Sequence, residues 1–370
     1  MRIKRVLMLA GSPESRCMYN LSLRYTRDCF DALSRVDGFS FHVAVVQPNG
    51  DWRFSQKTGQ PDLCLSDPVS RDTARDILRH SRYDVALPQL FCRAGMTDYR
   101  ALLERLQIPF IGNTADVMGI TANKATTKDS VSNVGVPVPA HQVMRGPDLQ
   151  RLNPPFIVKP NDSDNSFGVS LVHHRSEIGK AFAAAREHSS CVLAEQFIPA
   201  GREVRCGIIQ LGSKLECLPL QEYPLTDRNS IRQTSDKLII GEAGSVELAS
   251  KFKTSANTVP IDDPATRVVW DMAKRCHRAL GCRDYSLFDF RIDPNGTPYF
   301  MEAGLYCSFA PKSILALMAN EQGIGLETFF RKMAGQAMNR SGVGRSVETL
   351  RNTRRITRAN YINEPSKLET

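Results

Sequence analysis

Long apolar runs are missing from this sequence. No stretch approaches the roughly 18 residues that a membrane-spanning helix needs. The basic start followed by Val6–Ala10 is similar to a signal peptide, but Gly11 ends the apolar run after five residues, which is too early for one. We therefore expect a cytoplasmic chain with no membrane partner, in which Val6–Ala10 forms a buried first strand.

Closely spaced cysteine pairs are missing as well. The ten cysteines include no Cys-x-x-Cys pair, which argues against a structural zinc site. Their density is also far below that of a disulfide scaffold. We expect buried free thiols. No internal repeat is evident, which argues against a repeat architecture.

Acidic residues are too few to balance the basic ones, and the net charge is +9. The last 35 residues, Gln336–Thr370, hold seven basic and three acidic residues and few apolar ones. That composition predicts a solvated basic tail, in preference to a segment that binds RNA or another anionic surface, so nucleic acid is not the expected partner. The remaining charge suits an anionic substrate such as a nucleotide.

Strand and helix patterns alternate over the first 114 residues. Alternation of this kind predicts a parallel α/β layer. The predicted strands are Val6–Ala10, Val43–Val46, Asp84–Phe91 and Pro109–Gly112, and the predicted helices are Tyr19–Arg35, Thr73–Arg82 and Tyr99–Leu106.

Two further α+β units follow, predicted at 115–205 and 206–335, before the tail at 336–370. In the first, Thr121 is predicted to cap a helix that runs to Val134, where Gly135 stops it. In the second, Asp263 is the predicted cap of a helix that begins at Pro264 and ends at Gly281. Short strands are predicted at Phe156–Lys159, Val169–Val172, Cys191–Glu195 and Glu203–Leu211, with a helix at Glu177–Glu187.

A β-hairpin is predicted around Asn295-Gly296, because this dipeptide joins two alternating runs. With Asn295-Gly296 as the two-residue turn, Asp289 lies directly opposite Glu302; with Pro294-Asn295 as the turn, the two are diagonal neighbours. In either register one apolar face is expected, formed by Phe288, Phe290, Ile292, Tyr299, Met301 and Ala303. Like charges placed so close destabilise a sheet unless a hard cation such as Mg²⁺ binds between them. An exposed carboxylate pair screened by Arg291 is the alternative.

A polar loop follows a strand that carries a lysine. Lys159 lies near the end of the apolar run Phe156–Lys159, and the loop Asn161–Gly168 comes next. A small, polar loop that ends in glycine offers hydroxyl and backbone N–H groups to phosphate, although most such loops are ordinary turns.

These motifs, taken in order, resemble the ATP-grasp superfamily, and within it the D-alanine–D-alanine ligases. The motifs are Asn123-Lys124, Phe156–Gly168, Val192–Ile198, Gly201-Arg202-Glu203 and Asp289 with Glu302, and the resemblance runs from about Arg5 to Met333. It implies an ATP-grasp fold, in which an N-terminal parallel α/β domain precedes two α+β subdomains that clasp ATP. It also implies a homodimer, ATP as co-substrate, and Mg²⁺ or Mn²⁺ as the metal.

The resemblance also implies roles for individual residues. The two carboxylates of the hairpin, Asp289 and Glu302, would bind the metal. ATP would be bound by Lys124, Lys159, Ser166, Glu195, Gln196, Phe197, Ile198 and Glu203, with the phosphates on the lysines, the adenine edge near Glu195–Ile198 and the ribose on Glu203. Substrates would be bound by Glu14, Asn165, Lys312 and Ser313, and the catalytic residues would be Lys237, Arg291 and Ser308.

The chain departs from the ligase pattern beside the metal carboxylates. Leu287 stands where the ligases carry an arginine that stabilises the acyl phosphate, and Gly304 stands where they carry an asparagine. The whole block resembles the ligases that build mycosporine-like amino acids, which join serine or threonine to the cyclohexenone of mycosporine-glycine. Those enzymes phosphorylate a vinylogous carboxylate, which fits the missing arginine.

Three functions therefore stand at this stage. The first is an ADP-forming C–N ligase of the mycosporine type. The second is a D-alanine–D-alanine ligase or related dipeptide ligase in which Arg291 or Arg283 replaces the missing arginine. The third is a non-catalytic nucleotide- or RNA-binding protein on an ATP-grasp scaffold. The retention of both lysines and both metal carboxylates argues against the third.

Overall fold

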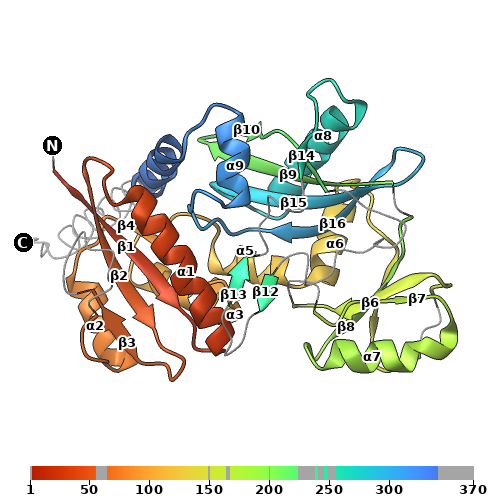
Figure 1. Ribbon diagram of the computed structural model, residues 1–370, viewed down its shortest axis with the longest axis horizontal. Coiled ribbons are helices and arrows are strands. Elements are labelled where there is room, and N and C mark those ends of the chain that lie inside the picture. Colours follow the sequence, from red (N-terminus) through yellow and green to blue (C-terminus); the bar gives the residue numbers. More distant parts are fainter. Residues whose placement is uncertain are drawn as a thin grey trace, which may run out of the picture.

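The computed structural model describes residues 2–55, 65–148, 151–163, 167–199, 201–223, 238–240, 246–248 and 256–340. Within these residues the chain forms three main sheets (Figure 1), and the short strands β12 (Leu238–Ile240) and β13 (Val246–Leu248) pair with each other. No helix in this part of the chain is long and apolar enough to span a membrane. The nine cysteines it includes are all free thiols, as expected.

The N-terminal sheet confirms the predicted parallel layer. Strand β1 (Lys4–Gly11) lies between β2 (Phe39–Val46) and β4 (Val85–Pro88), and both pair with it in parallel. The short β3 (Trp52–Phe54) closes one edge antiparallel. The helices of this unit are α1 (Arg16–Leu33), α2 (Arg71–His80), α3 (Arg93–Met96) and α4 (Asp98–Arg105).

One predicted strand of this unit is wrong. Residues 109–112 make only an isolated bridge, between Phe110 and Ala86. The chain then turns at Gly112, which has a φ of 95° and whose N–H donates to Asp284 Oδ2 at 2.8 Å. A positive φ favours glycine and interrupts a strand, so the apolar run ends as a turn.

The central sheet has the order β5-β8-β6-β7 and is antiparallel throughout. Its strands are β5 (His141–Met144), β6 (Phe156–Pro160), β7 (Ser170–Val172) and β8 (Val192–Gln196), and η1 (Arg175–Glu177) leads into α7 (Ile178–Arg186), which packs on the sheet.

The helix predicted to begin after Thr121 begins elsewhere. The structure has α5 (Ala115–Ala122) and then a separate α6 (Lys124–Ser132), capped by Asn123, whose side chain accepts from Thr126 N–H at 2.9 Å. Thr121 instead donates its hydroxyl to Val117 O inside α5, at 2.8 Å. Asparagine is at least as good a cap as threonine, and here it starts the helix at Lys124.

The C-terminal sheet has the order β14-β11-β9-β15-β16, with β10 added on β9. Its strands are β9 (Arg202–Leu211), β10 (Lys214–Cys217), β11 (Gln221–Tyr223), β14 (Asn257–Thr258), β15 (Tyr285–Ile292) and β16 (Pro298–Gly304). Helix α8 (Pro264–Ala279) contacts β9, and Asp263 caps it as predicted, accepting from Ala265 N–H at 2.9 Å. Because β9 begins at Arg202, the predicted unit boundary at residue 205 falls inside a strand; the unit limits stay a prediction.

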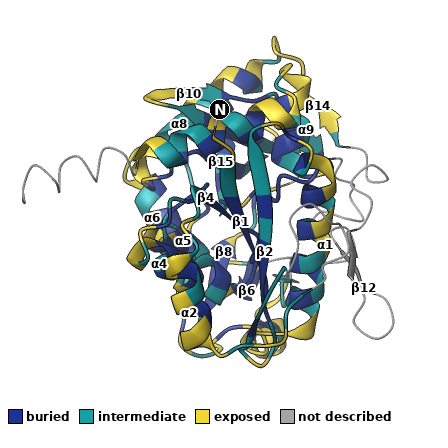
Figure 2. Ribbon diagram, turned by 90° about the vertical axis from the view of Figure 1, so that its left-hand side faces the viewer, coloured by how far each residue is buried: buried dark blue, intermediate teal, exposed yellow. Residues whose placement is uncertain are grey.

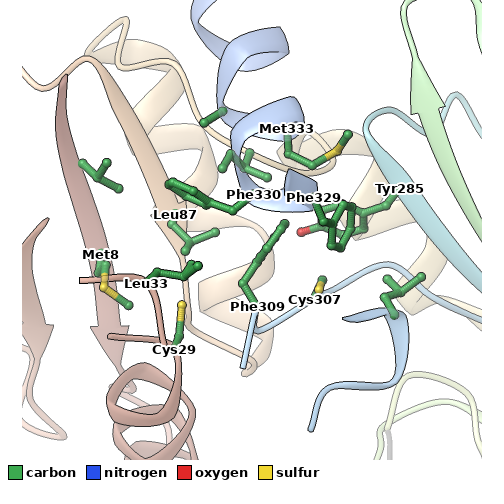
Figure 3. Packing of buried hydrophobic residues seen from close by; sticks show 14 of the residues in the cluster. Met8, Cys29, Leu33, Leu87, Tyr285, Cys307, Phe309, Phe329, Phe330 and Met333 are labelled. Atoms are coloured by element: carbon green, nitrogen blue, oxygen red, sulfur yellow. The ribbon is translucent and has the colours of Figure 1, made fainter. Parts of the chain in front are cut away.

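The N-terminal and C-terminal units share one hydrophobic core. A helix over residues 326–340 places Phe329 and Phe330 against Phe309, which is fully buried and stacks on Phe329 at 4.8 Å between ring centroids (Figure 3). The same cluster includes Met8 and Leu33 of the N-terminal unit. Buried residues lie along the inner strands, such as β4, β6 and β8, whereas exposed ones gather on surface helices such as α2 (Figure 2). The two units therefore pack against each other through this cluster.

Candidate active site

The predicted hairpin is formed by β15 and β16, and Asp289 lies directly opposite Glu302, as in the first of the two predicted registers. The turn differs from both predicted forms, since three residues, Pro294–Gly296, connect Asp293 and Thr297. Asp293 holds it by accepting from the N–H groups of Asn295 and Thr297 at 2.9 and 2.8 Å. A β-bulge after Asp289 then shifts the register by one residue.

The bulge corrects the predicted apolar face. Met301 is the extra residue on β16, so Phe300, not Tyr299 or Met301, joins Phe288 and Phe290 in the core. Met301 and Glu302 are left together on the open face. A shift of one residue moves side chains to the other side of a sheet, which is why strict alternation fails here.

Two cavities meet at the hairpin. We call them the Lys159 cavity and the Met96 cavity after a residue that lines only one of them. The residues that line both are Lys124, Asp289, Met301 and Glu302. The Lys159 cavity is also lined by Phe167, Glu195, Glu203 and Arg291, and the Met96 cavity by Met118, Arg205, Leu287, Gly304, Tyr306 and Ile314. The predicted metal carboxylates therefore form a common wall between two spaces.

Lys124 and Lys159 are brought to this wall by neighbouring backbone. Lys124 is the first residue of α6, and its N–H and that of Ala125 donate to Asn161, just after β6, which carries Lys159. The ammonium of Lys124 donates to Ser163 O at 2.5 Å, inside the predicted phosphate loop. Both lysines that were predicted to contact phosphate thus face the Lys159 cavity.

Glu195 is the counter-ion of two lysines. Its carboxylate lies 2.5 Å from Lys159 Nζ and 3.3 Å from Lys128 Nζ, and it is almost completely buried. Burial would raise the pKa of Glu195, but Lys128 and Lys159 outweigh it and lower that pKa to about 2. The side chain therefore pairs with the two lysines in this structure, and its predicted place at the adenine edge stays a prediction.

Lys128 is a residue that the sequence prediction missed. Burial lowers its pKa to about 8, against the attraction of Glu195. Its ammonium also donates to Met301 O at 2.5 Å, at the bulge. Its position one helical turn after Lys124 was the available signal, because residues four apart share a helix face.

Glu203 and Arg291 form a second pair on the Lys159 cavity. They lie opposite each other on β9 and β15, with 3.4 Å between Arg291 Nη2 and Glu203 Oε2. Arg291 also donates to Ile198 O at 3.2 Å and lies 5.7 Å from the centre of the Phe197 ring. Arg291 thus lines the Lys159 cavity beside the predicted ribose carboxylate, whereas Leu287, at the position of the missing arginine, lines the Met96 cavity.

The arginine nearest the carboxylate wall is Arg205, also missed from the sequence. It lies opposite Asp289 on β9 and binds that carboxylate through two hydrogen bonds, one of which is 2.6 Å from Nη2 to Oδ2. The signal was its spacing of two from Glu203, which places both on one face of the strand. Arg283, the other proposed stand-in, donates to Gly112 O at 2.7 Å and lies against the Phe110 ring, lining neither cavity.

The remaining predicted residues are less central. Gln196, Phe197 and Ile198 follow one another at the end of β8 but are not among the lining residues of the Lys159 cavity. Ser308, Lys312 and Ser313 are likewise outside the lining of the Met96 cavity, although their neighbours Tyr306 and Ile314 line it. Predicted residues that lie outside the described part of the chain are Asn165, Ser166 and Lys237.

Glu14 binds the N-terminus of helix α3. Its carboxylate accepts from the N–H groups of Arg93 and Ala94, at 3.3 and 2.5 Å. The helix it holds ends at Met96, which lines the cavity. Glu14 itself is exposed and is not among the lining residues, so its predicted role in substrate binding stays a prediction.

The carboxylate wall suits a hard divalent cation. Among the described residues no cluster of three or more potential protein ligands exists. Mg²⁺ commonly takes one or two carboxylates and completes its shell with water and phosphate oxygens, so Asp289 and Glu302 are a sufficient protein share. Both face the space that Lys124 and Lys159 surround with positive charge.

Known proteins are similar to this chain in sequence and in fold. Residues 134–334 match the family described as D-ala D-ala ligase C-terminus. A D-alanine--D-alanine ligase of Geotalea uraniireducens is 29% identical over 277 residues, covering 73% of this chain and 83% of the relative.

Two solved structures have the same fold. The D-alanine-D-alanine ligase of Coxiella burnetii superposes with a TM-score of 0.74 at 16% identity, over 96% of this chain and 99% of that one. The VanG D-Ala:D-Ser ligase of Enterococcus faecalis gives 0.73 at 20% identity, over 91% and 100%. The family match spans more than half of the residues, so this chain belongs to the D-alanine–D-alanine ligase family, the ATP-dependent ligases with the ATP-grasp fold.

Proposed function

We propose that the chain is an ADP-forming ligase that joins an amino acid to a phosphorylated acceptor, with D-alanine as the first candidate for both. The observation that carries this proposal is the shared wall: Lys124, Asp289 and Glu302 line both cavities. A phosphoryl group held at this wall can pass from a nucleotide on one side to an acceptor on the other. The names of the curated relatives favour D-alanine.

The reaction has two steps. An acceptor oxygen attacks the γ-phosphorus of ATP, and the bond to the bridging oxygen breaks with its electron pair leaving on ADP. The amine of the second substrate then attacks the acceptor carbon; the C–O bond to phosphate breaks, and the amine loses a proton. The products are a C–N bond, ADP and phosphate.

The described residues divide this work between them. Lys124 and Lys159 neutralise phosphate charge, and Glu195 keeps the Lys159 ammonium in place. Bound Mg²⁺ would supply further charge neutralisation during phosphoryl transfer. Apolar residues of the Met96 cavity, among them Leu287 and Ile314, keep water from the acceptor side.

The test is a set of turnover assays with the purified chain. ADP release should require Mg²⁺ and D-alanine, and mass spectrometry should show the dipeptide. The Lys159→Ala variant serves as the control for contaminating ligase. ADP release with no added amino acid, or none with any substrate, would contradict the proposal.

A ligase of the mycosporine type is the second candidate, favoured by Leu287 at the position of the missing arginine. ADP release that needs both a cyclohexenone acceptor and serine or threonine would select it. ATP binding with no turnover would select the non-catalytic alternative. The homodimer stays a prediction, testable by light scattering.

A further inference from the structure

Three charged residues form a row across three adjacent strands. Arg205 on β9 lies opposite Asp289 on β15, which lies opposite Glu302 on β16. Directly opposed residues of antiparallel strands have Cβ atoms about 5 Å apart. The guanidinium is therefore fixed next to the carboxylate wall by the order of the strands.

The Arg205 side chain is held in a defined position. Its two hydrogen bonds to Asp289 form a fork, and it lies 5.3 Å from the centre of the Tyr223 ring. Arg205 and Asp289 are each 14% exposed. An arginine guanidinium is always charged in proteins, so Arg205 is a fixed cation at this position.

Arg205 belongs to one of the two cavities. It lines the Met96 cavity and not the Lys159 cavity. Among the described residues that line the Met96 cavity, Lys124 is the other cation, and Lys124 also lines the Lys159 cavity. The acceptor side therefore has one cationic side chain of its own, at the wall where the phosphoryl group would cross.

The fork and a divalent cation require the same oxygens. Both carboxylate oxygens of Asp289 accept from Arg205. A cation that binds Asp289 must replace at least part of this pairing, and two positive groups on one carboxylate repel each other. The displaced guanidinium of Arg205 could then bind a phosphate group in the Met96 cavity, because its paired N–H donors match the spacing of phosphate oxygens.

We propose that Arg205 binds the transferred phosphoryl group on the acceptor side. In the metal-free protein Arg205 pairs with Asp289, and it is released when a divalent cation binds that carboxylate. This inference rests on the proposed function, because it assumes phosphoryl transfer across the wall. The competing explanation is a structural ion pair that only joins β9 to β15. The two explanations differ in what loss of the guanidinium does to metal binding.

The first measurement follows Mn²⁺ binding to the nucleotide-free protein by the electron paramagnetic resonance signal of free Mn²⁺. Arg205→Met should bind Mn²⁺ about tenfold more tightly than the wild type, because a competing cation is gone. Arg202→Met is the matched control: Arg202 is on the same strand and pairs with Glu222 at 2.7 Å, but it lines neither cavity. Its Mn²⁺ affinity should not change. Equal or weaker Mn²⁺ binding by Arg205→Met would overturn the proposal.

The second measurement titrates inorganic phosphate into the complex with Mg·ADP, by calorimetry. Phosphate is a product whatever the acceptor, so the probe does not depend on the substrate's identity. Arg205→Met should bind phosphate at least tenfold more weakly than the wild type and Mg·ADP within threefold of it. The inference would be refuted if the variant bound phosphate as tightly as the wild type, or if the wild type bound no phosphate. Failure of the wild type to bind Mg·ADP would instead refute the proposed function.

Arg205→Lys keeps the test decisive should Arg205→Met not fold. Lysine retains the charge but not the planar fork. Mn²⁺ affinity should stay within threefold of the wild type, while phosphate affinity in the Mg·ADP complex should fall about threefold or more. Unchanged phosphate affinity in this variant would count against Arg205 as the phosphoryl-binding group.

Discussion

Substitution of Glu195 by glutamine tests the electrostatic core of the site. The Glu195 carboxylate lies between Lys128 and Lys159, with side-chain exposures of 1%, 0% and 9%. Wild type therefore holds two positive charges and one negative charge in a nearly dry environment. Glu195→Gln leaves two ammonium groups facing each other without their carboxylate, so we expect a large loss of stability.

The magnitude follows in two independent ways. A pKa lowered from 4.5 to about 2 corresponds to about 3 kcal/mol of stability at neutral pH. Removal of one partner from a buried ion pair typically costs about 3–5 kcal/mol. Lys128→Met should cost less than Glu195→Gln, because it leaves Glu195 with Lys159 as a neutral pair.

The assay is urea denaturation at pH 7 followed by circular dichroism. Glu327→Gln is the matched control, since its carboxylate pairs with Arg331 on an exposed helix face and such pairs contribute about 0.5 kcal/mol or less. If Glu195→Gln lowered the free energy of unfolding by less than about 1 kcal/mol, or if Lys128→Met lowered it by more than Glu195→Gln, the stabilising role of the buried cluster would be refuted.

The same cluster sets a pH dependence. The pKa of Glu195 is lower in the folded chain than in the unfolded chain, so its contribution is fully present above about pH 4.5 and is lost as the pH falls toward 2. The difference in unfolding free energy between wild type and Glu195→Gln should therefore shrink over that interval. A constant difference would mean that the carboxylate titrates normally.

Three further outcomes are expected. Lys159→Ala should fold but lose the thermal protection that ATP gives the wild type, about 2.7 kcal/mol at a hundredfold excess over the dissociation constant; full protection would remove Lys159 from the site. Asp289→Asn should lower turnover at least a hundredfold and apo stability by about 1–2 kcal/mol, because it loses the Arg205 fork; retained turnover would refute the metal wall. Truncation after Arg340, which keeps the ion pair of Arg340 with Asp284, should leave turnover within twofold, whereas a tenfold loss would show that the tail contributes to the site.

The sequence predicted correctly those helix ends that depend mainly on neighbouring residues. Asp263 followed by Pro264 marks a helix start whatever surrounds it, and the helix begins there. Gly281, with a φ of 66°, ends that helix region as predicted. The start of α6 was misplaced because Thr121 and Asn123 are both good caps two residues apart. In the structure Thr121 lies inside α5, which Thr114 caps, and Asn123 caps α6.

The hairpin shows where a prediction from strict alternation of side chains along a strand fails. Asp289 opposite Glu302 was predicted from a two-residue turn, yet the turn has three residues, and the bulge at Met301 compensates for the extra one. The longer turn and the bulge cancel at the pair of Asp289 with Glu302. Between the turn and the bulge they do not cancel, so Phe300 and Met301 were assigned to the wrong faces of the sheet. Sequence alone gives the pairing of the carboxylates but not the curvature that a bulge introduces.

The contact of Arg205 with Asp289 could not be predicted from the sequence for a different reason. Arg205 is 84 residues from Asp289, and their contact exists only because β9 and β15 are neighbours in a sheet whose strand order is not the chain order. Leu287 stands where the ligase pattern has an arginine, and this difference was interpreted as a sign of an unusual acceptor. A guanidinium does line the Met96 cavity, supplied by the adjacent strand. The absence of arginine at 287 therefore favours a vinylogous acceptor less strongly than the sequence alone indicated, and the choice depends on which acceptor the Met96 cavity binds.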